Sequence, residues 1–137
     1  MNSSPVQLVS FLLIKEKAVL AEVRKSSDNF GAGAVWLPGG HVEKGESTLD
    51  AFVRELNEEL GVVPIDYFEL IQSPFVKDHK KYTIHYYAVT KWLGNIVNKE
   101  AAQLVWVSEK EVQKLSEAVD QKAFKKALQK INLVWAD

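Results

Sequence analysis

A single amphipathic segment, residues 47–61, constrains the fold of this chain more than any other stretch. Ser47 or Thr48 can cap the start of a helix there, and Gly61 supplies a stop signal at the other end. Between these signals the apolar side chains recur at helical spacing: Leu49, Phe52, Val53, Leu56 and Leu60. The pattern predicts an α-helix that packs one face against a hydrophobic core.

Three glutamates lie beside that apolar face. At about 100° per residue, Glu55, Glu58 and Glu59 form one contiguous stripe along the predicted helix. Like charges at this spacing destabilise an exposed helix by roughly 0.2–0.5 kcal/mol per pair, and a divalent cation would remove the repulsion. Mg²⁺ prefers hard oxygen ligands and often binds one or two carboxylates together with substrate phosphates. Taken alone, such a stripe is more often a solvated acidic face, so its surroundings decide.

The sequence Pro38-Gly39-Gly40 interrupts the chain sharply before this helix. Glycine lets the backbone approach a ligand because no Cβ stands in the way, and it could aim a carbonyl at a metal. A plain turn explains an isolated Gly-Gly pair better. Here, however, the pair leads into the acidic helix, with Glu46 and Arg54 between.

Residues 40–62, GHVEKGESTLDAFVRELNEELGV, resemble the Nudix box over its whole length. Trp36-Leu37-Pro38-Gly39 also resembles the family's approach to the box, and the order of the flanking strands extends the similarity over nearly the whole chain. Every fixed or class-restricted position of the box is in register: Gly40, Glu46, Arg54, Glu55, Leu56, Glu58, Glu59, Gly61 and Val62.

The resemblance implies one Nudix hydrolase domain over residues 1–137, with the box at 40–62. It implies an α/β fold, a Nudix-type α/β/α sandwich with a central mixed sheet. The residue pattern itself predicts strands at 6–14, 18–23, 35–37, 67–71, 82–89 and 104–107. It also predicts a brief helix at 109–115 and a final helix at 121–131.

A metal site follows from the same resemblance. Glu55, Glu58 and Glu59 would bind Mg²⁺ or Mn²⁺, helped by the Gly40 carbonyl. Arg54 would orient a glutamate through a bidentate contact, and Glu46 would be a structural partner in that network.

Many family members supply a further carboxylate from outside the box, and Glu100 is the candidate here. Either Glu100 or a box glutamate would be the general base that activates water. The alternative is that Glu100 is a loop residue without a role.

Five residues outside the box are candidates for substrate binding. Arg24 and Lys25 lie where MutT-type members place phosphate-contacting residues, and Trp36 could stack on a base. Asp120 and Gln121 lie near the start of the last helix, where such members read the base. Each has an ordinary explanation as well: a solvated strand end, a packed tryptophan or a helix N-cap.

The resemblance favours a MutT-type enzyme that cleaves a nucleoside triphosphate, ordinary or oxidised, to a monophosphate and pyrophosphate. Hydrolysis of a nucleotide sugar, ADP-ribose or a dinucleoside polyphosphate is the main alternative. A non-catalytic nucleotide-binding module is a weaker one, because such modules usually lose box glutamates and this chain keeps them all.

The amino-acid composition restricts the kinds of molecule that this protein is expected to bind. The 17 Lys and Arg residues nearly balance 18 Asp and Glu residues, which argues against a nucleic-acid polymer or an anionic membrane as partner. The absence of cysteine excludes disulfides and thiolate chemistry. The sequence MNSSPVQ has no signal-peptide character. We therefore expect a cytoplasmic protein, a monomer or a homodimer, that acts on a small-molecule nucleotide.

Overall fold

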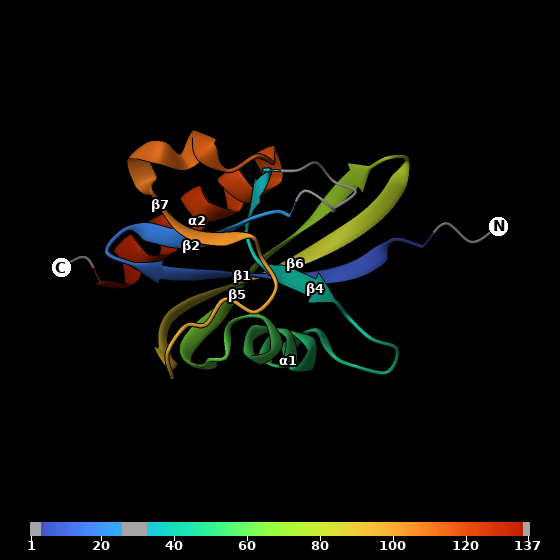
Figure 1. The fold of residues 1–137 in the computed structure, drawn as a ribbon, viewed down its shortest axis with the longest axis horizontal. Helices are drawn as coiled ribbons and strands as arrows, with labels where there is room; N and C mark the ends of the chain where they lie inside the picture. Colours follow the sequence, from blue (N-terminus) through green and yellow to red (C-terminus); the bar gives the residue numbers. More distant parts are fainter. Residues whose placement is uncertain (1–3, 26–32, 136–137) are drawn as a thin grey trace.

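The computed structural model describes residues 4–25 and 33–135, and within them a central sheet lies between helices (Figure 1). The elements in chain order are β1 (Val6–Lys15), β2 (Ala18–Val23), β3 (Val35–Trp36), β4 (Gly39–His41), α1 (Thr48–Leu60), β5 (Val63–Lys77), β6 (Lys80–Leu93), β7 (Gln103–Ser108), the 3-10 helix η1 (Glu109–Lys114) and α2 (Ala118–Trp135).

The sheet is mixed, as predicted, and β1 is at its centre. Strand β1 runs parallel to β6, from the pair Val6–Tyr82 to the pair Leu13–Val89, and antiparallel to β2 and β4. The strands follow the order β3-β2-β1-β6-β5, and two further strands lie off this path: β7 pairs with β2, and β4 pairs with β1.

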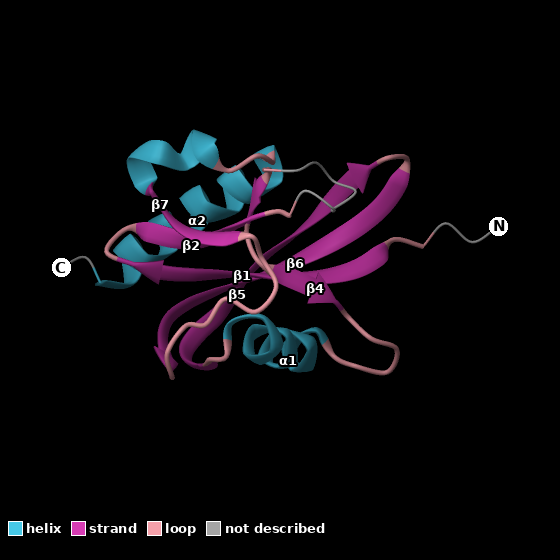
Figure 2. Ribbon diagram, viewed as in Figure 1, coloured by secondary structure: helices cyan, strands magenta, loops and turns pink. Residues whose placement is uncertain are grey.

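Side chains on the two faces of β1 enter two separate hydrophobic clusters. Leu12 and Ile14 pack into the cluster under α2, whereas Phe11 and Leu13 pack into the cluster under α1. Successive residues of a strand point to opposite faces of a sheet, so β1 serves both layers. Figure 2 shows α1 on one side of the sheet and α2 on the other, which is the predicted α/β/α arrangement.

Helix α1 begins and ends where its local signals predict. The Ser47 hydroxyl accepts a hydrogen bond from the Asp50 N–H at 3.0 Å, and Gly61 caps the C-terminus in the left-handed region with φ of 74°. The predicted apolar face was too broad: Leu49 and Val53 are 42% and 37% exposed. The buried residues of the helix are Ala51, Phe52, Leu56 and Leu60.

Three other predictions needed correction. The glycines Gly39 and Gly40 are in strand β4, paired with Ser10 and Val9 of β1, and do not form a turn. Strands β5 and β6 extend well beyond the predicted cores at 67–71 and 82–89. Helix α2 begins at Ala118, so Asp120 is within its first turn and is not its N-cap. None of the described helices combines the length and the apolar character needed to cross a bilayer.

Candidate active site

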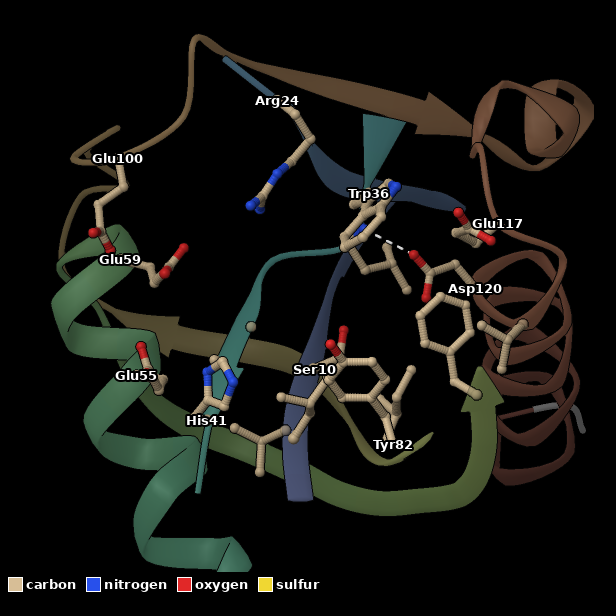
Figure 3. A pocket seen from close by; sticks show the side chains of 18 of the residues that line it. Ser10, Arg24, Trp36, His41, Glu55, Glu59, Tyr82, Glu100, Glu117 and Asp120 are labelled. Atoms are coloured by element: carbon tan, nitrogen blue, oxygen red, sulfur yellow. Dashed lines mark hydrogen bonds between the residues drawn. The ribbon is translucent and has the colours of Figure 1, made fainter. Parts of the chain in front are cut away.

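One cavity of about 390 Å³ gathers most of the predicted site residues (Figure 3). Its floor is formed by β1 and β4, and its walls come from α1, β2, β3, the β5–β6 hairpin, the 94–102 loop and the start of α2. Carboxylates of α1 and the loop gather at one end, and aromatic side chains gather at the other (Figure 3). The predicted residues that line it are Arg24, Trp36, Gly40, Glu55, Glu58, Glu59, Glu100 and Asp120.

Arg54 lies next to the acidic end and holds several groups at once. Its Nε and Nη2 atoms donate to the two oxygens of Glu46 at 2.7 and 2.9 Å, which is a bidentate ion pair. Its Nη1 atom donates to Glu58 at 3.1 Å and to Glu55 at 3.3 Å. Donation from Arg54 and from the Glu43 N–H lowers the pKa of the Glu46 carboxyl to about 2. Arg54 therefore ties the loop before α1 to two of the helix glutamates.

Gly40 makes room for the Glu55 carboxylate. A Cβ at position 40 would collide with the carboxyl group of Glu55. The Glu55 side chain is only 13% exposed, and burial is the main cause that raises the pKa of its carboxyl. The β4 backbone at Gly40 and the α1 carboxylate can approach each other only because position 40 carries no side chain.

Glu59 lies among other acidic side chains at this end of the cavity, namely Glu22, Glu55 and Glu100. Burial raises the pKa of Glu59 to about 9, and the neighbouring carboxyls of Glu22, Glu100 and Glu55 add to the rise. Burial likewise raises the pKa of Glu22, against the opposing effect of Arg24. Ionised carboxylates so close together repel one another unless a proton or a cation is added.

These residues fit a divalent cation by their donor chemistry, because carboxylate and carbonyl oxygens are the ligands that Mg²⁺ and Mn²⁺ prefer. Among the residues the structure describes, no three acidic or histidine side chains already converge as a finished metal cage. The contacts of Arg54 explain part of this, since it draws Glu55 and Glu58 toward itself.

Arg24 and Trp36 form the roof of the cavity. The Arg24 guanidinium carbon lies 5.2 Å from the centre of the Trp36 ring, a cation–π geometry. The Nη1 atom of Arg24 is 2.8 Å from Glu22 Oε1. The Trp36 ring meets Phe75 edge to face, with centroids 6.4 Å apart. One face of the tryptophan is thus partly covered by an arginine.

Asp120 lies at the aromatic end and is 6% exposed. Its carboxylate accepts hydrogen bonds from the Tyr86 hydroxyl at 2.7 Å and the Leu37 N–H at 3.1 Å. Burial nevertheless raises the pKa of Asp120 to about 6. An acceptor group is therefore fixed in a desolvated place beside the aromatic rings.

Two of the substrate-binding candidates lie away from the cavity. Lys25 is exposed and does not line it. Gln121 turns to the other side of α2, where its Nε2 atom donates to the Leu115 carbonyl at 2.8 Å. Both predictions rested on sequence position alone, and each side chain lies next to one that does face the cavity.

Glu117, Phe75 and Tyr82 line the cavity and were absent from the prediction. His41 lines the cavity too, in agreement with its position beside the box. Glu22 lies behind Arg24 and contacts Glu59. The available signal for Glu22 was a charged residue inside the otherwise aliphatic run 18–23. A buried charge in a strand needs a partner, and Arg24 is two residues away on the same face.

The family model described as NUDIX domain matches residues 6–128. The 8-oxo-dGTP diphosphatase of Escherichia coli (strain K12) is 30% identical over 105 residues, 75% of this chain and 80% of that protein. The CTP pyrophosphohydrolase of the same organism is 31% identical over 114 residues, 77% of this chain and 78% of that protein.

The fold has close structural counterparts. The MutT NUDIX hydrolase from Burkholderia pseudomallei superposes with a TM-score of 0.80, covering 90% of this chain and 98% of the other at 20% sequence identity. At 20% identity this superposition shows only that the two folds are alike. The match of the family model to residues 6–128 shows that the chain shares the family's ancestry.

Proposed function

Because this chain belongs to the NUDIX domain family, we propose that it hydrolyses a nucleoside triphosphate, ordinary or oxidised, to a nucleoside monophosphate and pyrophosphate in the presence of Mg²⁺ or Mn²⁺. One observation carries the proposal: a single cavity joins the box carboxylates to an aromatic pocket that ends in a buried acceptor. A nucleotide presents the matching pair of features, charged phosphates at one end and a flat base at the other.

At the acidic end, Glu55, Glu58, Glu59 and Glu100 would hold the cation, together with the Gly40 carbonyl. A bound divalent cation would offset the negative charge that develops on the phosphate oxygens during hydrolysis. Arg54 would fix the helix glutamates in place, because it already holds Glu46, Glu55 and Glu58.

The general base in this proposal is Glu100, with a box glutamate as the alternative. Glu100 lines the cavity from an exposed loop and contacts Glu59. A carboxylate there can accept a proton from a water that attacks phosphorus, and the proton then stays on its oxygen until product leaves. Its exposure would let that proton return to solvent.

At the opposite end, Asp120 would read the base. An ionised carboxylate only accepts hydrogen bonds, so it favours bases that present an exocyclic amino group at that position. Guanine, cytosine and adenine carry such a group, whereas thymine has carbonyl oxygens in its place. The two relatives named for 8-oxo-dGTP and CTP act on such bases, which supports this assignment. Trp36 and Tyr82 would supply the aromatic walls.

The test is a panel of substrates incubated with Mg²⁺, with products separated by liquid chromatography. The panel holds ordinary and oxidised nucleoside triphosphates, ADP-ribose, nucleotide sugars and dinucleoside polyphosphates. We expect a monophosphate and pyrophosphate from a triphosphate whose base carries an amino group. Turnover of only a sugar nucleotide or a dinucleotide would overturn the substrate class, and turnover of nothing would favour a binding module.

Glu59→Gln provides the matched test of the metal end. It removes a ligand charge with little change in volume, so we expect turnover to fall roughly 100-fold or more and the thermal unfolding temperature to change little. Glu69→Gln is the control, because Glu69 is exposed on β5 and outside the cavity lining. Full activity of Glu59→Gln would remove Glu59 from the proposed metal ligands.

A further inference from the structure

Glu22 is a buried acid whose position the box does not account for. It is only 4% exposed, one residue before the end of β2, and it pairs across the sheet with Trp36 of β3 and Leu104 of β7. A charged side chain in such a place costs stability unless it is paired. Its retention therefore calls for an explanation beyond packing.

Two side chains contact the Glu22 carboxyl. Arg24 Nη1 lies 2.8 Å from its Oε1 atom, with the Arg24 side chain 27% exposed. The carboxyl of Glu59, from α1, contacts it as well. Glu22 thus touches both the arginine of the cavity roof and a carboxyl of the acidic end.

Arg24 has two sets of partners that compete for it. Its guanidinium now lies over Trp36, and Figure 3 shows it extending into the space between Trp36 and the glutamates Glu59 and Glu100. Arginine forms its strongest contacts with carboxylates, and bidentate pairs form where geometry allows. Glu59 and Glu100 offer such carboxylates, so loss of the Glu22 ion pair would let Arg24 compete with a cation for them.

We propose that Glu22 is a positioning residue that holds Arg24 against Trp36, so that the guanidinium faces substrate and the metal-binding glutamates stay open to a cation. The ion pair at 2.8 Å supplies the tether, and burial of Glu22 strengthens it because the local dielectric is low. The inference rests on the proposed function, because it assumes that Glu59 and Glu100 bind the metal and that Arg24 contacts the nucleotide.

The direct test measures Mn²⁺ binding to the nucleotide-free protein by electron paramagnetic resonance of the unbound ion. Glu22→Gln removes the ion pair to Arg24 and should weaken Mn²⁺ binding roughly tenfold, the scale seen when a residue supporting a metal ligand is lost. Arg24→Gln alone should change binding little, because Arg24 is already held away. The double variant should recover most of the lost affinity, because the competing cation is gone.

The alternative is that Glu22 acts only through its charge. In that case Arg24→Gln alone would tighten Mn²⁺ binding, and the effects of the two single changes would add up in the double variant. Additive effects, or unchanged Mn²⁺ binding in Glu22→Gln, would overturn the proposal. Should Glu22→Gln fail to fold, Glu22→Asp carries the same test, because it keeps the charge but shortens the tether.

Steady-state kinetics separate this inference from the proposed function. At saturating Mg²⁺, Glu22→Gln should raise the KM for the nucleotide roughly tenfold with a smaller change in kcat, because a ground-state contact through Arg24 is lost. The Mn²⁺ measurement needs no substrate. If it gives the non-additive result but no nucleotide is hydrolysed, the proposed function fails and the tether stands. If nucleotides are hydrolysed and the Mn²⁺ effects are additive, only the tether fails.

Discussion

At Asp120, burial and hydrogen bonding act on the same carboxyl in opposite directions. Burial raises the pKa to about 6, while donation from the Tyr86 hydroxyl and the Leu37 N–H opposes the rise. Glu117, the other charged group facing it, adds to the rise through repulsion. The folded chain therefore holds this proton more tightly than the unfolded chain, where the ordinary value is 3.8.

This shift predicts a pH dependence of stability. The stabilising contribution of the Asp120 proton is complete below the unfolded pKa and is lost as the pH rises through the folded pKa. Asp120→Asn removes it, so the wild-type advantage in free energy of unfolding should fall by up to roughly 3 kcal/mol between about pH 4 and pH 7. Urea denaturation at several pH values measures the difference. Asp66→Asn, at an exposed site on β5, is the control, and parallel curves for wild type and Asp120→Asn would contradict the prediction.

Some residues of the site could be predicted from the sequence, and others could not. The box glutamates were identified because their spacing is a signal within one helix. Glu22 and Glu117 reach the site only through strand pairing and the packing of α2, and neither has a local pattern. Lys25 and Gln121 were predicted in the site but lie outside it. Each is next to a residue that lines the cavity, but that position does not determine which way a side chain points.

At the scale of elements, the short strand β4 controls how closely α1 approaches the sheet. A Cβ at Gly39 would collide with the Val9 carbonyl oxygen of β1, whereas one at Gly40 would collide with the end of the Glu55 side chain. Backbone cannot move aside, but a long side chain can. Two neighbouring glycines therefore have different roles, one in the fold and one in the site.

We accordingly predict opposite outcomes for two adjacent alanine variants. Gly39→Ala should lower the free energy of unfolding by about 1–3 kcal/mol or more, since the backbone of β1 must shift. Gly40→Ala should unfold at nearly the wild-type temperature but lose roughly tenfold or more in turnover, because Glu55 is displaced. Thermal melting and turnover on the same preparations separate the two. Equal effects on both variants would mean that Glu55 is not held by this contact.

The elements differ in how far the sequence predicts them. Helix α1 was predicted at both ends because Ser47 and Gly61 are local signals. Strand β5 was predicted much too short, at 67–71, whereas it spans Val63–Lys77 and contains Pro64 and Pro74. Both prolines lie at the edge of the sheet, because β6 is the one strand that pairs with β5 among the residues that the structure describes. On an edge strand a residue without an N–H leaves no partner unsatisfied, so proline is tolerated there.

At the scale of the whole molecule, β1 joins the two layers into one cooperative unit. Leu13 is fully buried in the cluster under α1, and Leu12 beside it is fully buried in the cluster under α2. Leu13→Ala should cost roughly 2–5 kcal/mol, the range for a truncated core leucine. Circular dichroism and tryptophan fluorescence should nevertheless report a single coincident transition.

The control is Leu93→Ala at the end of β6, where the side chain is 65% exposed. Its effect on the free energy of unfolding should stay within about 0.5 kcal/mol. Separate transitions for the two probes in Leu13→Ala would show that the layers unfold independently. Strand β1 would then contact both layers without coupling their unfolding.

The residues of the two ends of the cavity are distributed differently along the sequence. The carboxylates and their arginine come largely from one short stretch, Gly40 to Glu59, whereas the aromatic end is assembled from β3, the β5–β6 hairpin and α2. Mutations at the dispersed end can accumulate one at a time without touching the compact one. Under the proposed function, such a division would let the specificity for the base change while the residues that cleave the phosphate bond stay the same.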